Sequence, residues 1–505
     1  MKIKKPLCSV LLASVLFVLK NFAQEASSTA DKEKAFLERL HSISSHVLYD
    51  YVKELTSDKY AGRLTGTEEF NASAAWVADK FQTWGIEPMG DDGTYYQNFP
   101  NPYTLVFKEC EVTLNMPYKN GVIKKHYTYV NEFIPGSTSG SGEVTAEVIY
   151  VGYGITAPEL GYDDYKGMDV KGKIVLLERE DPVPPDKDPD LFKKWRPYSF
   201  HQYKLENAVQ HGAKGMLYNY GPIANPNNAY DANFIYSHVG DSVVADMFAG
   251  TGRVHKDVVE KIEKELKPQS FKTGKTVTIK NTTEHHPEGI GRNVIGVLRG
   301  SDPQLKDEVI IVGGHLDHLG RCYDIMPGAN DNASAVAVLL GLTEAVAKWE
   351  VKPKRSILFI CFGAEEQAVA GSEYYLAHPA FPLEKTACFI NMDGVGAGDK
   401  LSALAAENYP DLWKFIKLAN DQYTHRIIRP TYFHNLARPR LDAARFMWKG
   451  IPTVSFGAYG SLSYYHVPQD DIRIITPEIM EDLAQLLFVA VADMANQDSL
   501  DFRKK

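Results

Sequence analysis

The stretch VIIVGGHLDHLGRCYDIMPGANDNA, residues 309–333, decides the fold. Residues 309–312 form a short apolar run that ends at a glycine pair, which predicts a buried strand because the run is too short for a helix. The Ala-rich apolar segment that follows the stretch, as far as Trp349, predicts a helix. Its expected N-cap is one of three residues, Asn330, Asp331 or Asn332. The stretch therefore predicts a strand–loop–helix unit.

Three ionisable residues accompany this unit. His315 and Asp317 are two residues apart, so an extended backbone places both side chains on the same side. Asp331 follows one loop later. In open α/β sheets, binding sites lie at the carboxyl ends of the strands. Histidine and carboxylate side chains suit a divalent metal with mixed nitrogen and oxygen ligands.

Three further apolar runs, residues 355–362, 386–392 and 451–456, also end in or lead to ionisable residues. Parallel strands bring such ends to one edge of a sheet. The residues expected at that edge are Glu365, Glu366, Asp393, Tyr465 and His466. The alternation of strands and helices after residue 293 predicts an α/β domain with a mostly parallel mixed sheet sandwiched by helices.

Two histidines and three or four carboxylates can hold two divalent ions if one carboxylate bridges them. A nearby carboxylate that is not a ligand can take a proton from the attacking water. Spacing alone leaves open which of Glu365 and Glu366 binds metal. Asp317 is well placed to orient the His315 imidazole. Hydrolysis of an amide or ester is the expected reaction.

Residues 103–285 differ from the rest of the chain in sequence pattern. They contain many Gly, Pro and Asp residues, and their short alternating runs predict strands. The clearest predicted strands are residues 148–155 and 172–177, and residues 181–197 are expected to form a loop. Helical periodicity precedes this segment, at residues 35–55 and again before Gly85. A mainly-β insert within an α/β domain is the expected organisation. The predicted segments are a signal peptide (1–23), the first part of the α/β domain (35–102), the insert (103–285) and the rest of the α/β domain (286–498).

The N-terminus has lysines, an apolar run at residues 7–19, and small residues ending at Ala23. This pattern is typical of a secretory signal peptide, and the run is too short for a permanent membrane span. Cleavage near Ala23 predicts a secreted or periplasmic protein without a membrane span. The full chain has a formal net charge of −9 and no basic patch, which argues against nucleic acid as a partner. The oligomeric state and any cysteine pairing stay open.

The motifs GGHLDH, GANDNAS, GAEEQAVAGS, INMDGVG and YHVPQDD, in this order, resemble the M28 family of co-catalytic zinc peptidases. The upstream segment AGRLTGTEEFNASAAWVADKFQTWGIEP is similar to the usual N-terminal segment of that family. VIYVGYGITAPELGYDDYKGMDVKGKIVLL and KLENAVQHGAKGML resemble the protease-associated (PA) domain. The resemblance implies a zinc-exopeptidase fold with a PA-like insert, two zinc ions and peptide substrates.

The resemblance also implies a role for each site residue. His315 and Asp393 would bind one zinc ion, Glu366 and His466 the other, and Asp331 would bridge them. Glu365 would be the general base, with Asp317 as the acid that orients the first histidine. Tyr465 is a candidate for stabilising the oxyanion.

Some positions depart from the family pattern. Many relatives have Ser-Asp-His or a similar triplet where residues 441–443 read Leu-Asp-Ala. His318 stands where Ser is frequent, and two interpretations are open: it lines the pocket, or, as we slightly favour, it caps the loop. Arginines in the segment 432–440 would favour a carboxylate-bearing substrate if they faced it, but we favour the simpler interpretation that they are exposed in a loop. These differences concern specificity, because no ligand position is lost.

Three functions remain as hypotheses. The first is an exported zinc aminopeptidase. The second keeps the site but changes the substrate, as in a glutamate-carboxypeptidase-like enzyme, a dipeptidase or, less in keeping with two intact metal positions, a single-zinc glutaminyl cyclase. The third is a non-enzymatic binding protein of the transferrin-receptor-like branch, which intact ligand positions argue against. Metal content separates the third from the others, and a substrate panel separates the first two.

Overall fold

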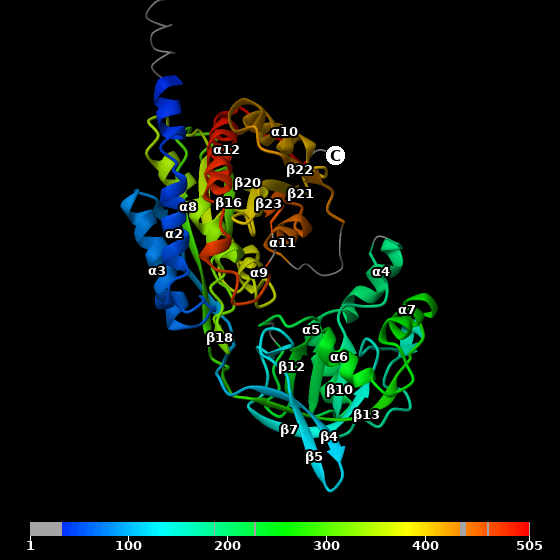
Figure 1. Ribbon diagram of the computed structural model, residues 1–505. Coiled ribbons are helices and arrows are strands. Elements are labelled where there is room, and N and C mark those ends of the chain that lie inside the picture. The colour runs from blue at the N-terminus through cyan, green and yellow to red at the C-terminus, as the bar shows by residue number, and fades with distance from the viewer. Residues whose placement is uncertain (1–32, 186, 227–228, 435–440, 462–463, 504–505) are drawn as a thin grey trace, which may run out of the picture.

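The computed structural model describes residues 33–185, 187–226, 229–434, 441–461 and 464–503 (Figure 1). The predicted signal peptide, residues 1–23, lies outside these ranges. Among the described residues, no helix has both the length and the apolar character needed to cross a membrane.

A nine-stranded mixed sheet forms the centre of the larger part of the molecule (Figure 1). Its middle is parallel, with β19, β16, β20 and β23 as neighbours in this order. These strands are β16 (Val309–His315), β19 (Ser356–Phe362), β20 (Thr386–Met392) and β23 (Thr453–Tyr459). All four runs predicted as buried strands are therefore strands, and their carboxyl ends meet at one edge.

Antiparallel strands flank this parallel centre. On one side, β15 (Ile290–Leu298) pairs with β19, and the short β1 (Glu87–Pro88) and β2 (Tyr96–Pro100) pair with β15. On the other side, β21 (Lys400–Leu404) is antiparallel to β23 and carries β22 (Ile428–Thr431) in parallel.

Helices cover both faces of the sheet, which explains why its central strands are apolar throughout rather than alternating. One face packs against α2 (Ser45–Leu55), α3 (Glu68–Thr83), α8 (Ser334–Ala347) and α12 (Pro477–Asn496). The other face packs against α9 (Ala370–Ala377) and α11 (Asp442–Trp448). The α/β fold class predicted from sequence is confirmed.

A second sheet lies apart from the first, at the lower right of Figure 1. It has eight strands in the order β5-β4-β13-β7-β10-β11-β12-β6. Their bounds are β4 (Glu111–Tyr118), β5 (Gly121–His126), β6 (Phe133–Pro135), β7 (Gly142–Tyr150), β10 (Ile174–Glu178), β11 (Gly215–Asn219), β12 (Ile235–Val239) and β13 (Phe271–Asn281). We call residues 103–285, which contain this sheet, the insert.

The insert contains more helix than its sequence pattern predicts. The expected loop at residues 181–197 includes α4 (Pro189–Trp195), which Asp188 caps by accepting a hydrogen bond from the Leu191 N–H at 2.9 Å. Proline at the first position of a helix is compatible with the helical backbone, so it is not a reliable loop signal there. Three more helices follow: α5 (His201–Gln210), α6 (Asp241–Phe248) and α7 (His255–Glu265).

The N-terminal helical prediction is partly wrong. Residues 33–40 are helical and α2 begins at Ser45, with a turn between them. The continuous apolar periodicity at residues 35–55 therefore spans two helices. The second predicted helix is α3, which begins after the N-cap Thr67 and buries the expected apolar stripe.

Two paired strands carry the chain into and out of the insert. β3 (Tyr103–Val106) and β14 (Thr283–His286) are antiparallel, and β3 also pairs with β17 (Arg321–Cys322), which follows the loop after β16. A small apolar cluster joins the two parts, with members from the insert and from residues 319–326. The insert is thus anchored beside the carboxyl edge of the main sheet.

Candidate active site

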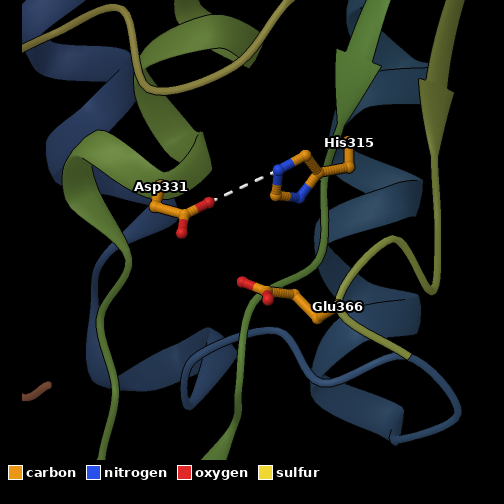
Figure 2. A group of neighbouring side chains, drawn as sticks. All are labelled: His315, Asp331 and Glu366. Atoms are coloured by element: carbon orange, nitrogen blue, oxygen red, sulfur yellow. Dashed lines mark ion pairs between the residues drawn. The ribbon is translucent and has the colours of Figure 1, made fainter. Parts of the chain in front are cut away.

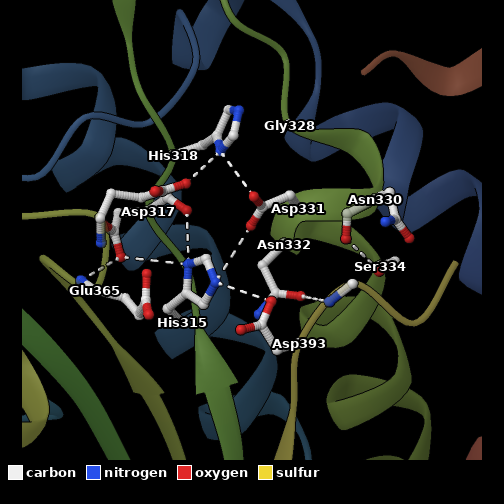
Figure 3. Close-up of polar contacts among 12 residues, drawn as sticks. His315, Asp317, His318, Gly328, Asn330, Asp331, Asn332, Ser334, Glu365 and Asp393 are labelled. Atoms are coloured by element: carbon white, nitrogen blue, oxygen red, sulfur yellow. Dashed lines mark hydrogen bonds and ion pairs between the residues drawn. The ribbon is translucent and has the colours of Figure 1, made fainter. Parts of the chain in front are cut away.

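His315 is the last residue of β16 and is almost fully buried. Its Nε2 lies 3.3 Å from Asp331 Oδ1 and 3.6 Å from Asp393 Oδ1 (Figure 3). Its Nδ1 lies 3.1 Å from the main-chain oxygen of Asp317. Because a carbonyl oxygen can only accept, Nδ1 carries the proton and donates. Nε2 is therefore the nitrogen that faces the carboxylates.

The Asp317 side chain makes further contacts, which its spacing from His315 in the sequence does not predict. Its carboxylate accepts hydrogen bonds from the N–H groups of Glu365, at 3.2 Å, and Glu366, at 3.3 Å. The distance from its Oδ1 to His315 Nδ1 is longer, 3.7 Å. Asp317 thus orients His315 mainly through its main chain, and its side chain fixes the turn after β19 that presents both glutamates.

Asp331 lies in the irregular π-helical turn η5 (Ala329–Ala333) directly before α8, and the helix-cap prediction is wrong. The N-cap of α8 is Ala333, which makes no side-chain cap. The side chains of Asn330 and Asn332 instead bond across to the turn after β20: Asn330 Oδ1 accepts from the Gly396 and Ala397 N–H groups, and Asn332 Oδ1 accepts from Gly394. These bonds tie the loop of Asp331 to the loop of Asp393.

Asp470 also holds the Asp331 loop in place. Its carboxylate accepts from the N–H of Asn330 at 2.8 Å and of Asp331 at 3.0 Å. Burial raises the pKa of Asp470 to about 6, and the nearby His318 opposes that shift. The YHVPQDD motif contains Asp470, so the sequence carried a signal for this residue that the pattern analysis did not use.

His466 lies beside the carboxylate oxygen of Asp331 that does not face His315. Its Nε2 lies 3.4 Å from Asp331 Oδ2 and 2.9 Å from Glu366 Oε2. The two oxygens of Asp331 thus face different histidines. Tyr465 stacks on the His466 ring, with centroids 3.7 Å apart, and about half of its surface, 52 %, is exposed.

His318 belongs to the same cluster, so the favoured loop-cap interpretation of this residue is wrong. Its side chain is fully buried, and Nδ1 donates to Glu366 Oε1 at 2.7 Å. The same nitrogen lies 4.0 Å from Asp331 Oδ2. Glu366 is thus contacted by two imidazoles, one at each carboxylate oxygen.

His315, Asp331 and Glu366 converge on one small volume, and each offers a ligand atom within 4.8 Å of the others (Figure 2). Burial alone lowers the pKa of His315, but the Asp317 and Asp393 carboxylates outweigh it and raise that pKa well above its usual value. A field that favours a proton on a buried imidazole also favours a divalent cation. The donor set, imidazole nitrogen and carboxylate oxygen, fits such an ion.

Glu365 differs from its neighbour Glu366 in its surroundings. Burial raises the pKa of Glu365 well above its usual value; His315 opposes the shift, and Asp442 and Asp393 add to it. Asp442, from the unusual 441–443 triplet, is itself buried, and burial raises its pKa to about 7. A carboxylate of raised basicity beside the cluster suits a role in proton transfer.

The cleft beside these residues has walls from both parts of the molecule. The main domain contributes Glu365 and Tyr465, and the insert contributes aromatic side chains, including Phe200, Tyr218 and Tyr220. In the segment 432–440, Tyr432 is about half exposed, whereas residues 435–440, with both arginines, lie outside the described residues.

Arg63, from the AGRLTGT segment, is a site residue that the sequence analysis missed. Its guanidinium is fully buried and donates to four main-chain oxygens: Leu316 and Leu55 at 2.9 and 2.7 Å, Pro327 at 2.8 Å and Gly328 at 2.9 Å. It therefore joins the loop after His315 to the loop before Asp331. Burial lowers its pKa to about 10, and Asp470 and Asp317 oppose that shift.

Replacing Arg63 with Met is expected to reduce both the free energy of unfolding and the metal affinity. Hydrogen bonds from a charged donor contribute about 1.5–3 kcal/mol each, and several buried carbonyls lose their partner, so we expect a loss above about 3 kcal/mol. Denaturant unfolding and metal titration measure the two effects. Arg355→Met is the matched control: Arg355 is equally buried but bonds to Glu308, away from the site. Equal metal affinity in the Arg63 and Arg355 variants would contradict this role.

A sheet edge that gathers two histidines around one shared carboxylate, with further acids beside it, defines the class: a metal-dependent hydrolase of the α/β type. Residues 293–491 match the family model of Peptidase family M28, so this part of the chain is similar to that family.

Individual relatives show the same similarity. Aminopeptidase YwaD of Bacillus subtilis is 26% identical over 366 residues, 68% of each chain. A Vacuolar membrane protease of Lodderomyces elongisporus is 25% identical over 181 residues, but the match spans only 18% of that protein. The solved structure of an aminopeptidase from Aneurinibacillus sp. strain AM-1 covers 92% of this chain and 97% of its own, with a TM-score of 0.65 and 22% identity, and shows the same fold.

Proposed function

We propose that the chain is an exported di-zinc exopeptidase that acts as an aminopeptidase. The observation that carries this proposal is the shared carboxylate: Asp331 Oδ1 faces His315 and Asp331 Oδ2 faces His466. A carboxylate placed between two imidazoles suits a bridge between two ions. The name of the Bacillus subtilis relative, which is an aminopeptidase, supports the choice of reaction.

The proposed ligands divide into two sets around Asp331. His315 and Asp393 would hold one zinc ion, and Glu366 and His466 would hold the other. Each histidine offers Nε2, because its Nδ1 donates to a main-chain oxygen. When bound, zinc supplies Lewis acidity and lowers the pKa of water.

The chain's own residues then move the proton. Glu365, which has no ligand role in this scheme, accepts a proton from the attacking water and returns it to the leaving amine. Its raised pKa strengthens it as a base. Tyr465, exposed to the cleft beside His466, can donate to the developing oxyanion. Asp317 keeps Glu365 in position through the N–H of that residue.

We further propose that residues 1–23 direct export to the periplasm or the medium and that residues 103–285 are a PA-like insert in a peptidase domain formed by residues 35–102 and 286–498. The charge–apolar–small pattern supports the first proposal. The separate eight-stranded sheet supports the second.

A substrate panel tests the reaction. Aminoacyl-p-nitroanilides with a free amino group are expected to be cleaved, and their N-acetylated counterparts are expected to be resistant. Cleavage of N-acylated dipeptides with a free carboxylate, without cleavage of the free-amino substrates, would replace the aminopeptidase proposal with the carboxypeptidase-like one.

A further inference from the structure

The insert contacts one of the proposed metal ligands directly. Ala224 lies in the segment 221–226, just after β11, and forms a reciprocal pair with His466. The Ala224 N–H donates to the His466 main-chain oxygen at 3.0 Å, and the His466 Nδ1 lies 2.8 Å from the Ala224 oxygen. The two residues are 242 positions apart in the sequence. The pair therefore joins the insert to the metal site.

The Ala224 oxygen fixes the tautomer of His466. A carbonyl oxygen only accepts, so His466 Nδ1 carries the proton, and Nε2 is left facing Glu366 and Asp331. A hydrogen bond of this kind sets which nitrogen binds metal and how the ring is turned. His315 Nδ1 donates the equivalent bond within its own loop, to the main-chain oxygen of Asp317. The two histidines are thus oriented by different parts of the molecule.

A buried histidine of the insert holds the segment that carries Ala224. His238, on β12, is fully buried, and its Nδ1 lies 2.6 Å from the oxygen of Ile223, the residue before Ala224. His238 Nε2 lies 3.2 Å from His201 Nε2. Because Nδ1 donates to a carbonyl, Nε2 accepts from His201. Burial lowers the pKa of His238 well below its usual value, which is consistent with the neutral form.

Further contacts keep the segment from shifting toward solvent. The Gly221 N–H donates to the Val239 oxygen at 3.2 Å, and the Asn225 N–H donates to Ser137 Oγ at 3.1 Å. Ala224 itself is fully buried in the apolar cluster that joins the insert to the main domain. Contacts within the insert therefore hold the segment whose Ala224 oxygen reaches His466.

We propose that His238 is a positioning residue for the metal site, acting through Ile223 and Ala224 on the orientation of His466. The inference rests on the proposed function, because it assumes that His466 binds metal. It makes the insert part of the metal site: the ion held by Glu366 and His466 depends on the insert, and the ion held by His315 and Asp393 does not.

Two substitutions separate positioning from general stability. His238→Leu keeps the apolar bulk and removes the donor to Ile223. His238→Asn keeps a donor, because the asparagine amide nitrogen takes the place of the ring Nδ1. His255→Ala is the matched control: His255 Nε2 lies 2.7 Å from Glu178 within the insert, so this variant perturbs the insert without touching the 221–226 segment. Ser137→Ala, which removes the acceptor for Asn225, is a milder second variant.

The test is titration of the metal-free, full-length protein with zinc, and with cobalt as a spectroscopic probe. The parent is expected to bind two ions. His238→Leu is expected to bind one of them about 10–100-fold more weakly, the cost typical of losing a partner that orients a ligand. Ser137→Ala is expected to weaken the binding of the same ion by a smaller factor. The spectrum of cobalt bound in that position is expected to change as well. His238→Asn is expected to restore most of the affinity, and His255→Ala to leave both ions as in the parent.

Two results overturn the inference while leaving the proposed function intact: parent-like binding of both ions by His238→Leu and Ser137→Ala, or equally weak binding by the Leu and Asn variants. If His238→Leu does not fold, the test depends on Ser137→Ala and His238→Asn. A zinc affinity of Ser137→Ala equal to that of the parent then overturns the inference. A parent that binds no metal overturns the proposed function instead.

Discussion

Replacing Glu365 with glutamine is expected to lower kcat by about 10²–10⁴-fold, the usual contribution of a general base, with little change in metal content. The amide keeps the shape of the side chain and cannot accept the proton of the attacking water. The N–H of residue 365 still donates to Asp317, so the turn after β19 is retained. Steady-state kinetics on an aminoacyl-p-nitroanilide and metal analysis of the same sample measure both quantities.

Glu373→Gln is the matched control for this variant. Glu373 lies nearby on α9, has an exposed side chain and pairs with Arg445 at 2.8 Å, so its replacement is expected to leave kcat unchanged. Full activity in the Glu365 variant would show that another group accepts the proton. Loss of metal in that variant would instead assign Glu365 to the ligands.

Replacing Asp331 with asparagine is expected to remove both metal binding and activity. Each of its oxygens faces a different histidine, so a neutral amide loses the shared negative charge and one of the two acceptors. We expect the metal affinity to fall by more than the roughly 10–100-fold that follows loss of an orienting partner. Metal titration and steady-state kinetics measure the effect.

Asp324→Asn, on the short strand β18 (Asp324–Ile325), is the control for Asp331. Asp324 pairs with Lys108 at 3.4 Å and is far more exposed. If the Asp331 variant kept two tightly bound ions, the bridge assignment would be wrong, although a metal site built from the other ligands could remain.

Much of the main sheet could be predicted from the sequence because its strands are buried on both faces. Such strands are apolar throughout, as at residues 309–312 and 386–392, and the ionisable residues that follow them stand out. Parallel pairing then brings those residues together regardless of loop conformation. The clustering of His315, Asp331, Glu366, Asp393 and His466 follows from topology.

Contacts made by main-chain atoms could not be predicted in the same way. Any residue type offers a carbonyl oxygen, so nothing in the sequence marks Ala224 as the partner of His466, or Leu316 as a partner of Arg63. The side chains of Asn330 and Asn332 fit a helix cap equally well, and only the nearby turn after β20 decides their partners. The loop-cap interpretation of His318 is wrong because its side-chain partner, Glu366, lies 48 positions away in the sequence.

The most direct test of the central claim is the metal content of the purified protein after equilibration with zinc and removal of the excess, determined by elemental analysis. Two zinc ions per chain are predicted, because Asp331 lies between two histidines that each have a further carboxylate partner. A chain that retains no metal after zinc has been offered would contradict the claim that this is a di-zinc peptidase.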